Sequence, residues 1–265
     1  MARLPGIMAL SAFLCSCTIL QPQRWPAQSG KIILTFDDGP NGDGVSEALL
    51  DVLRKHKVPA AFGVIGESVR ASPHIVQRIK EEGHDIINHT YSHNRPFFSA
   101  SALDLEIMRA DKAIALALSD PNYRTTRFRP PYGLITPAVH FSAEARSRQR
   151  AYLTFYIDDA GVGPRDAEQL LETIKRRLIH SNGGAIVLHE TRYPPTRAYL
   201  PDKSWLPSGI EDLIVWAHAR NMTFTKYRRR TWYKGCAGCK APLETGSMHS
   251  EGSAGHVFNL GIEAW

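Results

Sequence analysis

The sequence predicts an α/β fold built around a parallel sheet that is closed, or nearly closed, into a barrel. Two observations support this prediction: short apolar segments alternate with segments of helical period, and polar clusters follow several of the apolar segments. The strand–helix units recur about every 25–40 residues, as expected of βαβ crossovers in a parallel sheet. The chain has 265 residues, of which 43% are hydrophobic and 22% charged, and this suits one large globular domain.

The individual elements follow from periodicity and from turn residues. In residues 45–55, Leu49, Val52 and Leu53 share one face of a helix, and Gly83 follows the second predicted helix. In chain order, the predicted strands are residues 31–36, 58–65, 85–88, 127–128, 151–157, 184–188 and 222–225. The predicted helices are residues 45–55, 73–82, 102–118, 137–148, 167–179 and 210–220.

The first residues predict an export signal. Arg3 is the only charge before an apolar stretch, residues 4–14, that is too short to cross a bilayer. The segment Leu14-Cys15-Ser16-Cys17 resembles the bacterial lipobox, which predicts cleavage ahead of Cys17 and lipidation of its sulfur. Lipidated Cys17 would attach the chain to a membrane. The alternative is a plain secretory signal that is cleaved a few residues later.

The predicted domain boundaries follow changes in composition. They are a signal peptide at residues 1–16, a linker at 17–29, the α/β domain at 30–230 and a partly flexible tail at 231–265. The tail contains Cys236 and Cys239 in a CxxC motif. Export places both cysteines in an oxidising compartment, which favours a local disulfide. A structural zinc is disfavoured because no second pair stands at zinc-finger spacing.

The formal net charge of +6 is mildly basic and compatible with an anionic cell-wall or membrane neighbourhood. No RNA- or DNA-binding motif accompanies this charge, so it does not indicate a nucleic-acid partner. The sequence implies no protein partner.

Charged side chains gather where the predicted strands end. Asp37 and Asp38 follow the first strand, and ionised carboxylates near a core need a cation or several hydrogen bonds. His89 and His93 stand four residues apart, a spacing that on a helical turn lets both imidazoles share a metal. Two further clusters follow later strands, at residues 129–133 and at His189. The carboxyl ends of barrel strands open on one face, so these clusters should converge there.

Four motifs lie at these strand ends: Thr35-Phe36-Asp37-Asp38-Gly39, His89-Thr90-Tyr91-Ser92-His93, Arg129-Pro130-Pro131-Tyr132-Gly133 and Leu188-His189. In this order they resemble the polysaccharide deacetylase family, which is carbohydrate esterase family four with the chitooligosaccharide deacetylase homology domain. The resemblance covers most of the chain, residues 30–225. It implies a distorted (β/α) barrel of about seven strands in a single catalytic domain. It also implies one divalent metal, usually zinc, with cobalt or another divalent ion as an alternative.

The resemblance further implies roles for the residues of the first three motifs. Asp38, His89 and His93 would bind the metal and leave positions open for water and the acetyl oxygen. The metal would lower the pKa of the water toward ~7 and polarise the carbonyl. Asp37 would be the general base, and Arg129 would pair with it to keep it ionised and oriented.

Other residues would act on the acetyl group and on the leaving amine. The backbone N–H of Tyr132 would stabilise the oxyanion, and Pro131 and Tyr132 would lie beside the substrate. His189 would protonate the leaving amine, and Leu188 would help to wall the pocket for the acetyl methyl group. These roles are those that the resemblance carries onto the matching positions.

One motif departs from the family pattern. The family carries Asp-Trp after the strand that precedes the last motif, and this chain has Gly161 and Val162 there. Asp158 or Asp159 is left as the carboxylate that could support His189, and the spacing does not decide between them.

The sequence therefore predicts an exported, metal-dependent hydrolase of the periplasm or cell envelope. Its expected reaction is removal of N-acetyl groups from an amino-sugar glycan such as peptidoglycan, a chitin-like chain or an exopolysaccharide. Two alternatives stay open: an O-acetyl esterase acting on a polysaccharide, and a non-catalytic glycan-binding protein that lost activity through the change at Gly161 and Val162.

Overall fold

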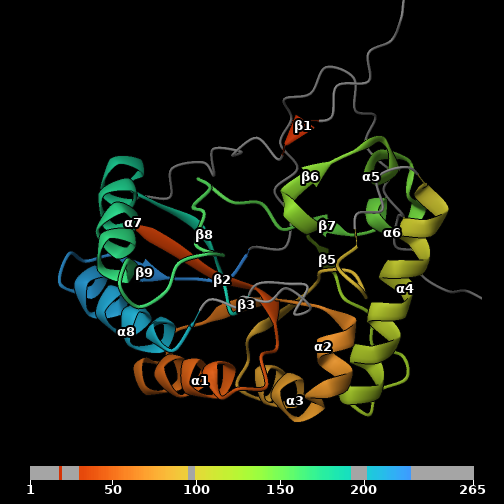
Figure 1. Ribbon diagram of the computed structural model, residues 1–265, viewed down its shortest axis with the longest axis horizontal. Coiled ribbons are helices and arrows are strands. Elements are labelled where there is room, and N and C mark those ends of the chain that lie inside the picture. Colours follow the sequence, from red (N-terminus) through yellow and green to blue (C-terminus); the bar gives the residue numbers. More distant parts are fainter. Residues whose placement is uncertain (1–17, 20–29, 95–98, 192–201, 228–265) are drawn as a thin grey trace, which may run out of the picture. The chain divides into compact units, whose positions relative to one another are not determined.

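A seven-stranded parallel sheet forms the centre of the described fold (Figure 1). The structure is a computed structural model that describes residues 18–19, 30–94, 99–191 and 202–227. The predicted signal peptide, Cys17, and the tail with Cys236 and Cys239 lie outside the described residues. The α/β class predicted from the sequence is confirmed.

The strands of the sheet lie in the order β7-β5-β4-β3-β2-β8, and β9 pairs with β2. Every pairing in this sheet is parallel. The strands are β2 (Lys31–Gly39), β3 (Ala60–Val64), β4 (Asp85–Asn88), β5 (Arg127–Phe128), β7 (Gln149–Arg150), β8 (Gly183–His189) and β9 (Thr223–Phe224). A separate antiparallel pair joins β1 (Thr18–Ile19) to β6 (Leu134–Ile135).

The sheet does not close into a barrel within the described part of the chain, because β7 and β8 are its two ends. The segment after β7 crosses this opening and forms one backbone–backbone hydrogen bond with a strand on each side. Ala151 N–H donates to the carbonyl of Phe128 on β5 at 3.0 Å, and Thr154 N–H donates to that of Ala185 on β8 at 2.8 Å. The prediction of a strand at residues 151–157 is therefore wrong. This stretch leads from one end of the sheet to the other instead of pairing along either.

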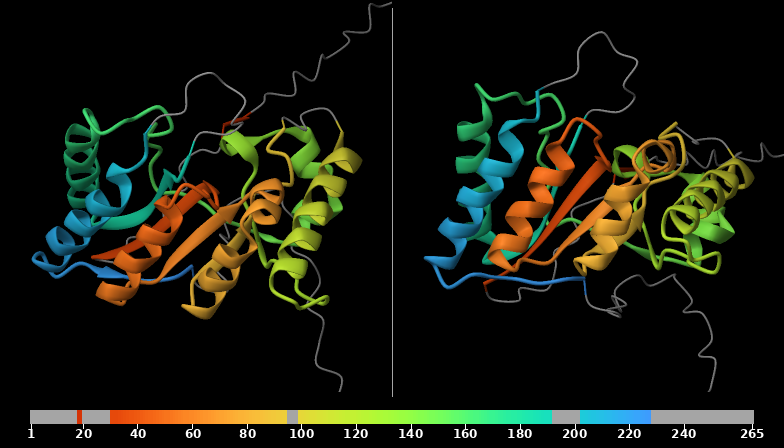
Figure 2. Two further views of the ribbon diagram at one scale, coloured as in Figure 1. Left: turned by 60° about the horizontal axis from the view of Figure 1, so that its bottom comes forward. Right: turned by 90° about the horizontal axis from the view of Figure 1, so that it is seen from below.

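The helices are α1 (Val45–His56), α2 (Gly66–Ala71), α3 (Pro73–Glu81), α4 (Ala100–Ala117), α5 (Pro137–Phe141), α6 (Ala143–Arg146), α7 (Ala167–Ser181) and α8 (Trp205–His218), with the 3₁₀ turn η1 (Pro131–Gly133). Helix α7 packs against α8, α8 against α1 and α1 against α3, and these helices cover one face of the sheet (Figure 2). The helix predicted at residues 137–148 is split in two at Ser142, whose side chain caps α6.

Alternate side chains of β2 face two different cores. Ile32, Leu34 and Phe36 have no exposed surface and pack with apolar side chains of the covering helices. Burial of side chains of this size stabilises the fold by roughly 1.5–3 kcal/mol each. The helix-covered face is therefore the main hydrophobic core.

The other face of the sheet changes character along its length. Ile33 and Ala185 belong to a smaller apolar cluster on this inner face. Because side chains alternate along a strand, Asp37 follows in the row of Ile33, and His189 follows in the row of Ala185. The inner face thus starts as apolar core and ends in charged side chains at the carboxyl edge of the sheet.

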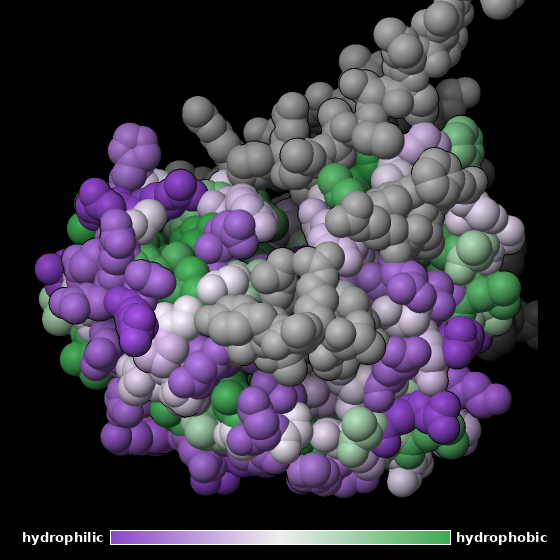
Figure 3. Space-filling view, viewed as in Figure 1, coloured by the Kyte–Doolittle hydropathy of each residue, from purple (hydrophilic) through white to green (hydrophobic). Residues whose placement is uncertain are grey.

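The described surface is mixed in polarity. On the face drawn in Figure 3, hydrophilic side chains surround small groups of apolar ones. Exposed large apolar residues such as Phe141 and Val215 lie on separate helices, as is normal for folded domains. Among the helices of the described residues, none has the length and hydropathy of a bilayer-spanning segment.

Candidate active site and metal centre

A bulge at the end of β2 brings Asp37 and Asp38 to the same side of the sheet. Consecutive side chains of a regular strand point to opposite faces. Here the β2–β3 register shifts between Asp37 and Gly39, and Asp38 adopts a left-handed φ of 68°. Such a bulge re-aims a side chain. Both carboxylates therefore approach His89, whose Nε2 lies 3.4 Å from Asp38 Oδ1 and 3.9 Å from Asp37 Oδ2.

Asp38, His89 and His93 form one buried cluster. Their potential ligand atoms lie within 4.8 Å of one another, and His93 Nε2 is 3.3 Å from Asp38 Oδ1. Asp38 Oδ1 is buried and has no hydrogen-bond partner, although a buried carboxylate oxygen needs one or a cation. Two imidazoles and one carboxylate are the donor set of a catalytic zinc-type site with an open position. The residues present fit a divalent metal ion.

The histidines of this cluster do not occupy a helical turn. The stretch after β4 is irregular, and Thr90 and His93 have left-handed φ values of 70° and 50°. The rings of His89 and His93 lie 4.9 Å apart between centroids. Convergence of the two residues is therefore as predicted, but the reason given, a four-residue helical spacing, is wrong. The loop backbone brings the rings together.

Left-handed residues are concentrated at this site. Among the described residues, Asp38, Thr90, His93 and Tyr132 are non-glycine residues with positive φ that lie in the site loops. The others, Lys57, Ser119, Asn182 and Asn221, follow helix ends, where this conformation is common. Holding a non-glycine residue in this region costs of order 1–3 kcal/mol of conformational free energy, and such residues cluster at functional sites.

The protonation of the cluster suits cation binding. Burial raises the pKa of Asp38, but the nearby His89 ring and the charges of His189 and His93 lower it to about 2. Burial and the charge of His89 lower the pKa of His93 to about 4, so its ring is neutral at neutral pH. Burial lowers the pKa of His89, but Asp37 and Asp38 raise it above its ordinary value. Metal binding needs the neutral ring, so it would compete with protonation of His89.

A hydrogen bond at Nδ1 fixes the orientation of the His89 ring. Its Nδ1 donates to the backbone carbonyl of Arg129 at 2.9 Å, which leaves Nε2 facing Asp38. Metal-binding histidines use such a bond to fix tautomer and ring orientation. Asn88 supports the same loop, since its Oδ1 accepts from Thr90 N–H at 3.0 Å and its Nδ2 donates to Asp111 on α4 at 2.8 Å.

Arg129 holds Asp37 from the other side. Its Nη1 donates to Asp37 Oδ1 at 2.5 Å, and its remaining N–H groups donate to Ala151 O and Tyr227 Oη, each at 3.0 Å. Burial lowers the pKa of Arg129, but the Asp37 carboxylate raises it above its ordinary value, so the guanidinium stays charged. Asp37 Oδ2 is left facing the His89 ring.

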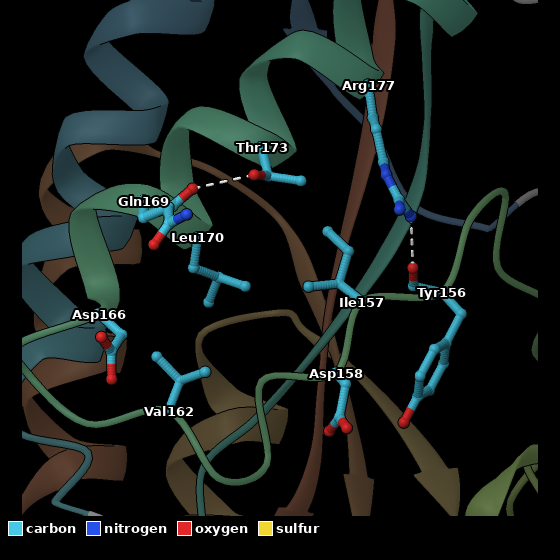
Figure 4. A pocket seen from close by; sticks show the side chains of 9 residues that line it. All are labelled: Tyr156, Ile157, Asp158, Val162, Asp166, Gln169, Leu170, Thr173 and Arg177. Atoms are coloured by element: carbon cyan, nitrogen blue, oxygen red, sulfur yellow. Dashed lines mark hydrogen bonds between the residues drawn. The ribbon is translucent and has the colours of Figure 1, made fainter.

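The carboxylate that supports His189 is Asp159. The Nδ1 of His189 donates to Asp159 Oδ1 at 2.6 Å, and the backbone N–H of His189 donates to Oδ2 at 2.8 Å. Asp159 has no exposed surface, whereas Asp158 is exposed and lines an open groove against α7 with Tyr156 (Figure 4). Burial lowers the pKa of His189, but Asp159, Asp38 and Asp37 raise it to about 9.

The turn η1 faces the cluster of Asp38, His89 and His93. Tyr132 has a left-handed φ of 58°, and its ring centroid lies 4.8 Å from that of His93. Its side chain is 42% exposed, whereas Pro131 is buried. Leu188 has no exposed surface and packs in the helix-covered core. This placement does not support a contact between Leu188 and substrate, because strand alternation puts Val187 nearer the inner face on which His189 lies.

Sequence reasoning missed residues that shape the site from other elements. Gly63 on β3 leaves room for the Asp37 carboxylate, Lys203 donates to Asp159, and Glu190 is buried beneath Gly39. A carboxylate near His189 was expected, and the adjacent residues Asp158 and Asp159 in the preceding loop were the available signal. The others belong to no motif, and nothing in their local sequence marks them.

Fold and site together define a class: α/β proteins with a buried Asp-His-His cluster and a hydrogen-bonded Asp–His pair at the carboxyl edge of a parallel sheet. The sequence model of the polysaccharide deacetylase family matches residues 26–151. A chitooligosaccharide deacetylase of Bradyrhizobium sp. (strain ANU 289) is 34% identical over 167 residues, which are 62% of this chain and 72% of that protein. A chitooligosaccharide deacetylase of Sinorhizobium fredii (strain NBRC 101917 / NGR234) is 34% identical over 142 residues, or 48% of this chain. The chain spans 64% of that relative's length.

Solved structures agree with the sequence matches. The crystal structure of the Bc1960 peptidoglycan N-acetylglucosamine deacetylase superposes with a TM-score of 0.61 at 25% identity, over 76% of this chain and 87% of that one. The chain therefore belongs to the polysaccharide deacetylase family. The family match at residues 26–151 contains the Asp-His-His cluster, whereas Asp159 and His189 lie beyond it.

Proposed function

We propose that this chain is a metal-dependent deacetylase that hydrolyses N-acetyl groups of an amino-sugar glycan. The observation that carries the proposal is the different pairing of two adjacent carboxylates. Asp38 approaches two imidazoles, whereas Asp37 is held by a buried arginine. One carboxylate is thereby suited to bind a cation, and the other to accept a proton.

The proposed ligands of the metal are Asp38, His89 and His93, and zinc is the proposed ion. The support is the donor set, because two imidazoles and a carboxylate with an open position suit zinc, although cobalt is a chemical alternative. A divalent ion bound there would polarise the acetyl carbonyl and lower the pKa of a water molecule.

Asp37 is the proposed general base. Its Oδ1 accepts the hydrogen bond from Arg129, so Oδ2 is the oxygen left to take a proton from the attacking water. Because Arg129 is charged and buried, it keeps Asp37 oriented while the proton moves. Base catalysis of this kind contributes about 10²–10⁴-fold to the rate.

His189 is the proposed general acid. Its Nδ1 is committed to Asp159, which leaves Nε2 to protonate the leaving amine. A pKa raised to about 9 keeps the imidazole protonated at neutral pH, as an acid requires. The backbone N–H of Tyr132 is the proposed donor to the oxyanion, with Pro131 beside the substrate. Val187, in place of Leu188, is the residue that we propose lines the pocket for the acetyl methyl group.

The proposed substrate class is an N-acetylated glycan of the cell envelope. Support comes from relatives named peptidoglycan N-acetylglucosamine deacetylase, one of which, from Bacillus cereus, is 32% identical over 60% of this chain. The test is acetate release from peptidoglycan, chitooligosaccharides, poly-N-acetylglucosamine and acetylxylan, with Asp37→Asn as the control. We expect release from N-acetylated glycans by the wild type only. An Asp37→Asn variant with wild-type activity would remove the assigned base.

The same screen separates the two alternatives. Turnover of acetylxylan alone would favour an O-acetyl esterase, since the same residues can act on an ester. Bound metal without acetate release from any substrate would favour a glycan-binding protein. The Asp159–His189 pair supports an enzyme, because it supplies the acid half that the change at Gly161 and Val162 had put in doubt.

Export and lipid anchoring are also proposed. They rest on the short apolar stretch after Arg3 and on the sequence that ends at Cys17. The proposed domain boundaries are those of the sequence, with the deacetylase domain at residues 30–230. Labelling cells with a lipid precursor tests the anchor: we expect label on the wild type and none on Cys17→Ser. An unlabelled wild type would remove the anchor without affecting the proposed reaction.

A further inference from the structure

A buried lysine lies behind the Asp159–His189 pair. Lys203 comes shortly before α8, and its side chain is 1% exposed. Its Nζ donates to Asp159 Oδ2 at 3.2 Å and to the backbone carbonyl of Asp159. Lysine is almost never buried to this degree without a paired charge, and Asp159 supplies that charge.

We propose that Lys203 is a positioning residue for His189: it holds Asp159 so that one carboxylate oxygen serves the imidazole, and it offsets part of the carboxylate's charge. This inference rests on the proposed role of His189 as the general acid. No motif of the family resemblance includes Lys203.

The two carboxylate oxygens of Asp159 accept hydrogen bonds from different donors. Oδ1 accepts from the ring of His189, and Oδ2 accepts from the backbone N–H of His189 and from Lys203. Trp205 Nε1 donates to the carbonyl of Val162 at 3.0 Å, so the start of α8 holds the Asp159 loop at a second point. The orientation of the carboxylate therefore depends on residues that precede and begin α8.

The charge of Lys203 opposes the effect of Asp159 on the imidazole. Burial lowers the pKa of His189, and Asp159 raises it. A cation on the far oxygen weakens the hold of that carboxylate on the imidazolium proton. Without it, the imidazole would bind its proton more tightly and donate it less readily. Other charged and titratable groups near His189 in the described structure include Asp37 and Asp38 on β2, His93 after β4, and Glu190, the next residue in the chain. Tyr156 and Asp158 interact with Asp159 or with each other in the same loop.

Three variants separate charge from geometry. Lys203→Gln can still donate to Asp159 but carries no charge, Lys203→Arg keeps the charge, and Asp159→Asn removes the carboxylate. We expect Lys203→Gln to raise the His189 pKa by about one unit, and Asp159→Asn to lower it. Lys203→Arg should stay within about 0.3 units of the wild type. A merely structural role for Lys203 would not produce shifts of opposite sign.

The measurement is NMR titration of the full-length, metal-loaded protein with histidine labelled at Cε1. His189→Asn identifies the signal of His189. Acetate release gives a second readout: the alkaline limb of kcat should move up in Lys203→Gln and down in Asp159→Asn, with KM unchanged. Because the acid is then weaker, kcat on the plateau should fall roughly threefold in Lys203→Gln.

A double variant keeps the test valid if a buried pair cannot lose one charge and still fold. Lys203→Met combined with Asp159→Asn removes both charges. The loss of Lys203 should change the His189 pKa less in the Asp159→Asn background than in the wild type, because part of its effect passes through Asp159. An unchanged or lowered pKa in Lys203→Gln overturns the proposal. So does an equally large effect of Lys203 in the wild-type and Asp159→Asn backgrounds.

Failure of the proposed function would look different. A wild type that releases no acetate from any glycan, with the expected NMR shifts intact, would overturn the deacetylase reaction and leave the relation between Lys203 and His189 standing. An Asp159→Asn variant with the wild-type His189 pKa would remove the basis of the inference itself.

Discussion

Gly63 lies beside Asp37 in the β2–β3 ladder, and a Cβ at position 63 would come within 2.1 Å of Asp37 Oδ1. That oxygen is the one that accepts the hydrogen bond from Arg129. Because Gly63 on β3 has no side chain, the Asp37 carboxylate on β2 can occupy the space beside it. A methyl group there could be accommodated only by moving Asp37 away from Arg129.

We expect Gly63→Ala to lower kcat by about 10²-fold or more, because it displaces Asp37, and a general base, the role proposed for Asp37, contributes about 10²–10⁴-fold to the rate. The overpacking should cost about 1–3 kcal/mol in the free energy of unfolding. Gly161→Ala is the matched control, since a Cβ at Gly161 meets nothing within 4 Å. Acetate release and urea unfolding measure both effects. A fully active Gly63→Ala would show that the position of Asp37 is not critical.

Metal removal should abolish activity and be reversed by zinc or cobalt. We expect one metal ion per wild-type chain and a loss of affinity in His93→Ala of more than about 100-fold. Because a metal would compete with protons for His89, whose pKa is raised, affinity should also fall as the pH is lowered. Isothermal titration with zinc at several pH values measures this. His74→Ala is the control, since the His74 side chain is 67% exposed on α3; a comparable loss in that variant would contradict the assigned ligands.

Asp159 and Asp158 are neighbours in the chain with different expected effects. Asp159→Asn should lower kcat by about 10–100-fold, because the His189 ring loses the carboxylate that orients it. Asp158→Asn should stay within about twofold of the wild type, because Asp158 is exposed and lines the groove against α7. Equal losses in the two variants would show that the hydrogen bond from His189 to Asp159 is not what matters.

Glu190 should make the protein less stable as the pH rises. Its carboxyl is buried beneath Gly39, and burial together with Asp37 and Asp38 raises its pKa from 4.5 to about 8. Between these values the folded chain holds a proton that the unfolded chain has released. The free energy of unfolding therefore decreases with pH across this window and levels off above about pH 8.

Glu190→Gln keeps the shape of the neutral acid and removes the titration. Its stability advantage over the wild type should be absent near pH 4.5 and grow up to about pH 8. Urea unfolding of chelator-treated protein measures it, so that metal binding does not add its own pH dependence. Glu168→Gln, on the exposed side of α7, is the control for the same change of residue at the surface. A pH-independent difference for Glu190→Gln would mean that Glu190 is ionised in the folded protein.

The sequence predicted the order of strands and helices well because those signals are local. The helix from Val45 and the strand from Asp85 follow from periodicity over a few residues. The strand predicted at residues 151–157 is wrong because the contacts that decide its structure are not local. Its apolar residues suit a strand, but whether it pairs depends on Phe128 and Ala185, which lie far away in the chain.

The candidate site shows the same division. Asp38, His89 and His93 were predictable because strand ends converge in a parallel sheet. The choice between Asp158 and Asp159 was not, since adjacent residues of one type differ only in burial. Lys203 could not be predicted, because it meets Asp159 across 44 residues of chain.

The bulge at Asp38 has a consequence for protein design. Two aspartates placed next to each other on an unbulged strand would point to opposite faces, and only one would reach the site. The segment Lys31–Gly39, by contrast, carries its own shift in register. Transplanted whole, with a glycine opposite its first aspartate, it would bring the proposed proton acceptor and the proposed metal ligand together into another parallel sheet.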